Sequence, residues 1–144
     1  MSNELIQVLC RGLLDELESA DAFVCMAQEI SRLDLKVRFI HYAQEELNHA
    51  SYLSGLLGQL APDLACVSSY EPPDFSEGLM AFMVTYLAKE EAAVFYYETL
   101  LNMVEKTEEK AILQRIYEEE KGHYEDITEI IKAHAADIME AGHV

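Results

Sequence analysis

Residues 39–53 (FIHYAQEELNHASYL) carry the pattern that decides the fold. Side chains that share one face of an α-helix recur at steps of three and four residues along the sequence. Those steps connect Phe39, Tyr42, Glu46, His49 and Leu53. Aromatic and aliphatic side chains are typical of a face that packs into a core, whereas a glutamate and a histidine are not. The stretch therefore predicts a helix whose buried face carries polar groups.

The same steps run through four segments of the chain. We expect helices over about residues 3–30, 34–60, 75–105 and 108–138. Short connections make the first two and the last two helices antiparallel hairpins. Six glycines and three prolines are too few for the frequent turns of an all-β chain. The sequence predicts an all-α four-helix bundle, with residues 1–144 as a single domain because chains usually divide only beyond about 250 residues.

The connection between the second and third helices is long. It spans about residues 61–75 and includes Pro62, Pro72 and Pro73, which interrupt the helical pattern. Fully extended, it reaches roughly 50 Å, whereas a helix of about 27 residues measures roughly 40 Å. We therefore expect a crossover along the length of the bundle, which leaves the two central helices parallel.

The chain is strongly acidic. Its 10 Lys and Arg against 27 Asp and Glu give a net charge of −17 with neutral histidines. This balance excludes a basic nucleic-acid footprint and attraction to an anionic membrane surface. The longest nearly uncharged run, Leu79–Ala88, is about half of a membrane span, and the acidic start of the chain predicts no signal peptide. We expect a cytoplasmic protein with no nucleic-acid and no membrane partner.

The three cysteines, Cys10, Cys25 and Cys66, are odd in number and never spaced as Cys-x-x-Cys. This spacing argues against a zinc knuckle, an iron–sulfur site or a rubredoxin-type knot. We expect no disulfide framework, and we expect three small apolar thiols in a reducing compartment.

Polar residues lie in the middle of the apolar stripes. Burying one unpaired carboxylate costs several kcal/mol, and four that converge would repel one another. No Lys or Arg lies on these stripes, so internal ion pairs are a poor remedy. Two divalent metal ions would supply four positive charges, with imidazoles as neutral ligands. The predicted metal ligands are Glu16, Glu46, His49, Glu90, Glu120 and His123.

The spacing of these six residues repeats. Glu46-x-x-His49 and Glu120-x-x-His123 each place both side chains on one helical face. An offset of 74 residues relates 16 to 90, 46 to 120 and 49 to 123. The repeat predicts two matching hairpins that share one dinuclear metal centre. The alternative, that these residues lie on a solvated face, requires the register of all four helices to be wrong.

At these residues the sequence resembles the rubrerythrin branch of the ferritin-like superfamily, over roughly Glu4–Ala136. Glu16–Phe23 and Glu90–Tyr97 are similar to the family's ligand helices, each with a small residue three positions after the glutamate and an aromatic seven after. Glu118–Tyr124 is close to the family's last ligand motif. The resemblance implies a ferritin-like bundle with the long crossover.

The resemblance also implies roles and chemistry. Such proteins reduce hydrogen peroxide, or oxidise Fe(II) with dioxygen or peroxide, with two iron ions that change between +2 and +3. Carboxylate and imidazole ligands also accept manganese, and zinc can bind by affinity. By this resemblance the metals would be bridged by Glu46 and Glu120, bound terminally by Glu16 and Glu90, and capped by His49 and His123.

The sequence departs from the family pattern in two ways. Rubrerythrins proper carry a further ligand glutamate at the position of Ala93. They also usually carry a four-cysteine rubredoxin domain that delivers electrons, which this sequence does not contain. Any electron donor would then be a separate protein.

Further residues flank the predicted ligands. Tyr42, Tyr86 and Tyr97 can hydrogen-bond carboxylates or pass an electron, although aromatic core packing is the simpler interpretation. Asn48 and Asp126 lie beside the histidines and are candidates for orienting the imidazoles.

Two helices have a second apolar face, which favours a homodimer, although one wide stripe per helix would look the same. These faces are Leu13, Leu17, Ala20 and Val24 on the first helix, and Ala81, Ala88, Ala92 and Phe95 on the third.

Three functions from different classes fit the sequence. The first is a di-iron oxidoreductase that reduces hydrogen peroxide or dioxygen, with Fe(II) or a small redox protein as reductant. The second is a non-catalytic dinuclear metal-binding or iron-sensing protein. The third is a bundle without metal, whose glutamates would be protonated and whose stability chelators would leave unchanged. Peroxide consumption separates the first from the second.

Overall fold

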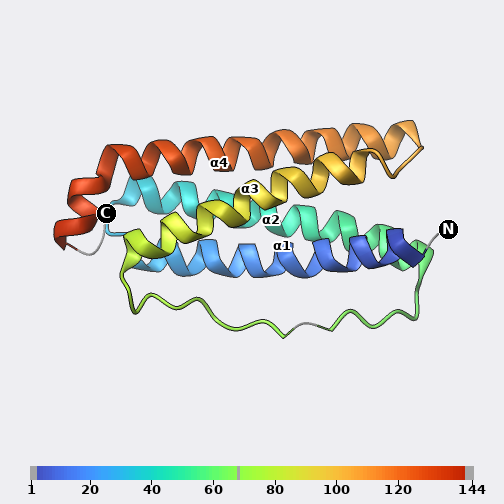
Figure 1. The fold of residues 1–144 in the computed structure, drawn as a ribbon, viewed down its shortest axis with the longest axis horizontal. Helices are drawn as coiled ribbons and strands as arrows, with labels where there is room; N and C mark the ends of the chain where they lie inside the picture. The colour runs from blue at the N-terminus through green and yellow to red at the C-terminus, as the bar shows by residue number, and fades with distance from the viewer. Residues whose placement is uncertain (1–2, 68, 142–144) are drawn as a thin grey trace. The chain divides into compact units, whose positions relative to one another are not determined.

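The computed structural model describes residues 3–67 and 69–141, with side chains through residue 134. Its helices are α1 (Asn3–Glu29), α2 (Leu33–Leu60), α3 (Leu79–Leu101) and α4 (Thr107–Ala141). Figure 1 shows that α1 and α2 run antiparallel, as do α3 and α4. The described residues contain no strand, which confirms the all-helical class. Among them, no helix is long and apolar enough to cross a membrane.

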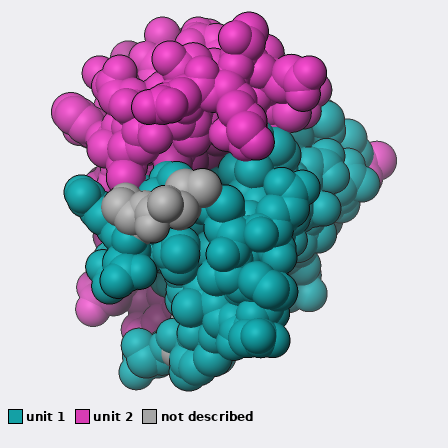
Figure 2. Space-filling view, turned by 90° about the vertical axis from the view of Figure 1, so that its right-hand side faces the viewer, with its two compact units in different colours: residues 1–28, 36–73 teal, residues 29–35, 74–144 magenta. Residues whose placement is uncertain are grey.

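The chain forms two compact units, which Figure 2 shows in different colours. Unit 1 comprises residues 1–28 and 36–73, and therefore holds most of α1 and α2 together with the first part of the long connection. Unit 2 comprises residues 29–35 and 74–144, and therefore holds α3 and α4. Each unit thus contains one copy of the predicted repeat.

The core of unit 1 follows the predicted stripes of α1 and α2. The rings of Phe23, Phe39 and Tyr42 meet edge to face, with centroids 5.3 to 6.0 Å apart. Beyond Leu53 the next helical step of three reaches Leu56, which is half-buried, and the buried residue is instead Leu57, four residues after Leu53. Steps of three and four from Leu53 reach the same helical face, so packing decides which leucine is buried.

The core of unit 2 also follows the prediction. The buried apolar residues of α3 and α4 recur at steps of three and four along each helix, as on a face that packs into a core. They are Leu79, Met83, Tyr86, Tyr97 and Leu100 on α3, and Leu113, Ile116, Ile127 and Ile130 on α4.

Helix α3 begins at Leu79, later than the predicted start near residue 75. Gly78 precedes it with φ of 96°, a left-handed conformation that glycine adopts without steric cost. The Gly78 amide donates to the Phe75 carbonyl over 2.8 Å, and the Ser76 amide donates to the Asp74 carboxylate over 2.9 Å. These turn bonds occupy the segment that the pattern assigned to the helix.

Helix α3 also ends earlier than predicted, at Leu101 instead of about residue 105. The Met103 amide bonds to the Leu100 carbonyl at 2.9 Å in a closing turn. Val104 stays buried although it lies outside the helix. It follows Leu100 by a helical step of four residues, and this spacing extended the predicted helix too far. Helix α4 begins at Thr107, one residue before its predicted start.

Residues 61–67 and 69–78 of the long connection contain turns but no helix. Figure 1 shows its first part running alongside α1. The contacts that fasten it there include a disulfide and a hydrogen bond. Cys66 forms a disulfide with Cys10, with the two Cα atoms 5.8 Å apart, and the Tyr70 hydroxyl donates a hydrogen bond to the Asp21 carboxylate.

The prediction that all three cysteines keep their thiols was therefore wrong. The connection returns along α1, so it brings Cys66 against Cys10 across 56 residues of sequence. No local spacing signals such a pair. Cys25 is not in a disulfide.

Candidate metal centre

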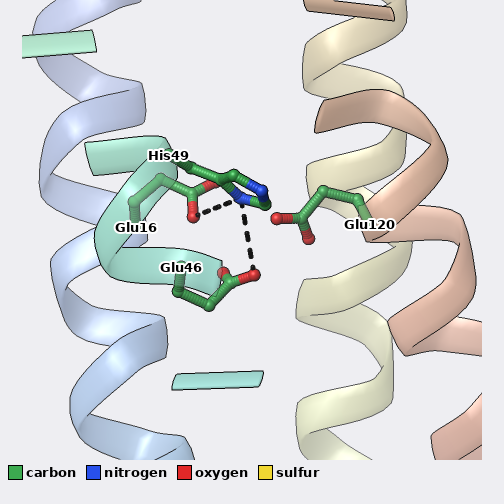
Figure 3. A group of neighbouring side chains, drawn as sticks. All are labelled: Glu16, Glu46, His49 and Glu120. Atoms are coloured by element: carbon green, nitrogen blue, oxygen red, sulfur yellow. Dashed lines mark ion pairs between the residues drawn. The ribbon is translucent and has the colours of Figure 1, made fainter. Parts of the chain in front are cut away.

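In unit 1, three predicted ligands come together from α1 and α2. The Nδ1 atom of His49 lies 3.3 Å from Oε2 of Glu16 and 3.7 Å from Oε1 of Glu46. Figure 3 shows these three side chains and marks both ion pairs with dashed lines. One ligand atom from each residue lies within 4.8 Å of the others, and none of the three residues is more than 4% exposed. We call them trio 1.

In unit 2, the three residues at the repeated positions make the same arrangement. The Nδ1 atom of His123 lies 3.7 Å from Oε2 of Glu90 and 3.9 Å from Oε2 of Glu120. One ligand atom from each again lies within 4.8 Å of the others, and all three residues are buried. We call them trio 2.

The hairpin geometry explains why each trio forms. Glu46 and His49 are three residues apart, so one helical face carries both. The neighbouring antiparallel helix then presents Glu16 to that face at the level of His49. In unit 2, α3 presents Glu90 to Glu120 and His123 of α4 in the same way.

The electrostatics of trio 2 show a shortage of positive charge. Burial raises the pKa of the Glu90 carboxyl to about 8, and the nearby Glu120 charge acts in the same direction, while the hydrogen bond with His123 lowers it. All ten Lys and Arg of the chain lie in the described part, and none is buried there. No lysine or arginine is therefore buried with the carboxylates of either trio to balance their charge.

The donor set fits a transition-metal ion. Each trio offers carboxylate oxygens and one imidazole nitrogen within a few ångströms, which suits iron, manganese or zinc. In each trio the same nitrogen, Nδ1, faces both carboxylates. An ion at that point would replace repulsion among buried carboxylates with attraction.

The residues predicted around the ligands have different environments. Tyr42, Tyr86 and Tyr97 are buried, and Tyr42 belongs to the aromatic core of unit 1, as the packing interpretation predicts. Asn48 is exposed, and Asp126 is half-buried.

One residue of α2 that shares a helical face with His49 was not predicted. Tyr52 is half-buried but its hydroxyl oxygen is buried. It follows His49 by three residues, so the helical spacing was the available signal.

The family comparison decides the relationship of this chain to known proteins. The model of the rubrerythrin family matches residues 8–131. The chain belongs to the rubrerythrin family. All six residues of the two trios lie within the matched range. A comparison with curated proteins found no match.

Solved structures show which fold this rubrerythrin-family chain shares. A hypothetical protein from Pyrococcus furiosus has a TM-score of 0.76 and 21% identity, over 89% of this chain and 88% of the other. A novel open-pore ferritin from the hyperthermophilic archaeon Archaeoglobus fulgidus has a TM-score of 0.73 and 19% identity, over 97% of this chain and 88% of the other. These similarities confirm the predicted ferritin-like four-helix fold, and at such identities they show the fold alone.

Proposed function

We propose that this chain is a non-haem di-iron protein that reduces hydrogen peroxide or dioxygen. The observation that carries the proposal is the pair of matching Glu–Glu–His trios, one in each unit, both buried and both at the predicted offset. The two trios would together hold two iron ions in one dinuclear centre. Membership in the rubrerythrin family supports the same centre.

The residues of the chain have defined tasks in this proposal. Glu16 and His49 would hold one iron ion, Glu90 and His123 would hold the other, and Glu46 and Glu120 would be shared by the two ions. Bound iron supplies electrons by changing between +2 and +3. In the metal-free protein Glu90 holds a proton at neutral pH, because its pKa is about 8. Metal binding must therefore release that proton.

The reducing equivalents must come from outside the bundle. The sequence has three cysteines in total, fewer than the four of a rubredoxin-type site. We propose Fe(II) itself or a separate electron-donor protein as the source.

A second function, a non-catalytic metal-binding or iron-sensing protein, is favoured by one residue. Ala93 on α3 is half-buried and offers no oxygen where rubrerythrins proper carry a further glutamate. A centre with fewer carboxylates binds metal but stabilises the ferric state less well.

The test is anaerobic titration with Fe(II), followed by peroxide. We expect two Fe(II) ions per chain and steady consumption of peroxide with a generic reductant. The double variant Glu46→Ala and His123→Ala should lose Fe(II) binding and peroxide consumption. The variant His41→Ala should retain these two properties because His41 is exposed and pairs with Glu45. Binding without turnover would favour the sensor. Unchanged stoichiometry in the double variant would refute the site.

We also propose that the chain forms a homodimer. Leu17, Val24 and Phe95, three residues of the predicted apolar faces, are 46%, 43% and 65% exposed. Ala20, assigned to the same face of α1, is instead buried. Sedimentation equilibrium of the purified chain tests the proposal, which predicts twice the monomer mass.

A further inference from the structure

We propose that Cys10 and Cys66 form a reversible dithiol–disulfide site that fastens the crossover to α1. Their Cα atoms are 5.8 Å apart, within the usual range for a disulfide of roughly 4.4 to 6.8 Å. Both cysteines are half-buried, so neither is enclosed in the core. The site lies wholly in unit 1, and it operates whether or not the trios hold metal.

The crossover around Cys66 has little burial of its own. Leu64, Val67 and Tyr70 are 43%, 84% and 37% exposed. At its start, the Ala61 amide donates to the Leu57 carbonyl of α2, and the Leu64 amide donates to the Ala61 carbonyl within the crossover. Segments with so few buried contacts open at low free energy. The disulfide and the exposed Tyr70–Asp21 hydrogen bond both join the middle of the crossover to α1.

The oxidation balances with hydrogen peroxide as the oxidant. One thiolate attacks a peroxide oxygen, the O–O bond breaks, and the departing hydroxide becomes water, which leaves a sulfenic acid. The second thiol attacks the sulfenic sulfur, the S–S bond forms, and a second water leaves. Two thiols and one peroxide thus give one disulfide and two waters. Two molecules of a small thiol such as glutathione reduce the disulfide to two thiols by exchange, and they leave joined as one molecule of their own disulfide.

The position of the disulfide in the sequence gives it a consequence for the metal centre. Residues 16, 46 and 49 lie between 10 and 66, so the covalent loop encloses all of trio 1. Closing that loop reduces the conformational freedom of the unfolded segment and so favours the folded hairpin. Oxidation would thus stabilise the part of the chain that supplies half of the ligands, under the conditions in which peroxide is present.

The first experiment counts thiols. The purified chain is equilibrated in mixtures of reduced and oxidised glutathione, trapped with an alkylating reagent and weighed by mass spectrometry. We expect one alkylated thiol, Cys25, in oxidising mixtures and three in reducing ones, with full return in either direction. Peroxide added to the reduced chain should also convert three thiols to one. A disulfide that persists in excess reduced glutathione until the protein unfolds would overturn the proposal, as would thiols that never pair.

The second experiment measures the fastening itself. A protease that cuts after Leu64 or Tyr70 should cleave the reduced chain about tenfold faster than the oxidised chain, because the open segment is the substrate. Cys66→Ser should be cleaved at the fast rate in both buffers, and Cys25→Ser should behave like the parent chain. If Cys66→Ser does not fold, the reduced and oxidised parent chains still give the comparison. Equal cleavage rates would contradict the fastening role.

Discussion

The Nδ1 atom of His49 lies 3.3 Å from the carboxylate of Glu16, although the two residues are on different helices. His123 faces Glu90 at 3.7 Å in the second unit. Each histidine follows its glutamate by 33 residues, from 16 to 49 and from 90 to 123. The internal repeat is therefore a repeat of interatomic geometry as well as of sequence, and each hairpin builds the same half-site.

Loss of one histidine should affect one metal ion more than the other. His49→Gln removes the only imidazole of trio 1, so we expect one of two ions to bind more weakly by about tenfold or more. His41→Gln on the same helix should bind both ions as the parent chain does, since His41 is exposed. Isothermal titration calorimetry with Mn(II), which avoids oxidation of the metal, measures the affinity of each ion in the two variants. Two unchanged sites in His49→Gln would contradict the assignment of this residue.

The stability of the metal-free protein should fall as the pH rises. The Glu90 pKa is about 8 in the folded chain against 4.5 as the ordinary value. Between these two values the unfolded state has released the proton and the folded state retains it, so rising pH favours unfolding. Urea denaturation at pH 5 and pH 8 should show this loss, and Glu90→Gln should reduce it. A metal-free chain that is more stable at pH 8 would contradict the prediction.

Two leucines of α2 test the register of the helix. Leu53 is fully buried, whereas Leu47 is 50% exposed. Leu53→Ala should lower the free energy of unfolding by about 2 to 5 kcal/mol, because it leaves a cavity in the core. Leu47→Ala should change it by roughly 0.5 kcal/mol or less, as surface substitutions usually do. Similar losses for both variants, measured by urea denaturation, would show that the face was misassigned.

A substitution at Ala93 tests whether the chain is a peroxide-reducing enzyme or a non-catalytic iron sensor. Ala93 lies three residues after Glu90, so Ala93→Glu adds a carboxylate to the same face of α3. We expect faster peroxide consumption per iron than in the parent chain, because a further anionic ligand stabilises the oxidised centre. Ala92→Glu places the same charge at an exposed position and should leave the rate unchanged. Equal rates in all three chains would show that this position does not limit the reaction.

Helical periodicity accounts for most of what the sequence could predict. Glu16, Glu46 and His49 lie at positions where steps of three and four demand a buried side chain, and the structure buries all of them. The repeat at 74 residues then places their counterparts in unit 2. Both deductions depend on local geometry, which a sequence encodes directly.

The features that the sequence could not predict depend on tertiary contacts or on single backbone conformations. The start of α3 is set by the left-handed Gly78, although Phe75 fits the apolar pattern of a helix. The pairing of Cys10 with Cys66 depends on the path of the crossover along α1. No periodicity specifies that path.

Anomalous diffraction from crystals of the iron-loaded chain, collected on both sides of the iron absorption edge, tests the dinuclear centre most directly. We predict two iron peaks, one bonded to Nδ1 of His49 and the other to Nδ1 of His123, each at roughly 2.0 to 2.2 Å as is usual for metal–imidazole bonds. Iron found only among the exposed carboxylates, with both trios empty, would contradict the proposed function.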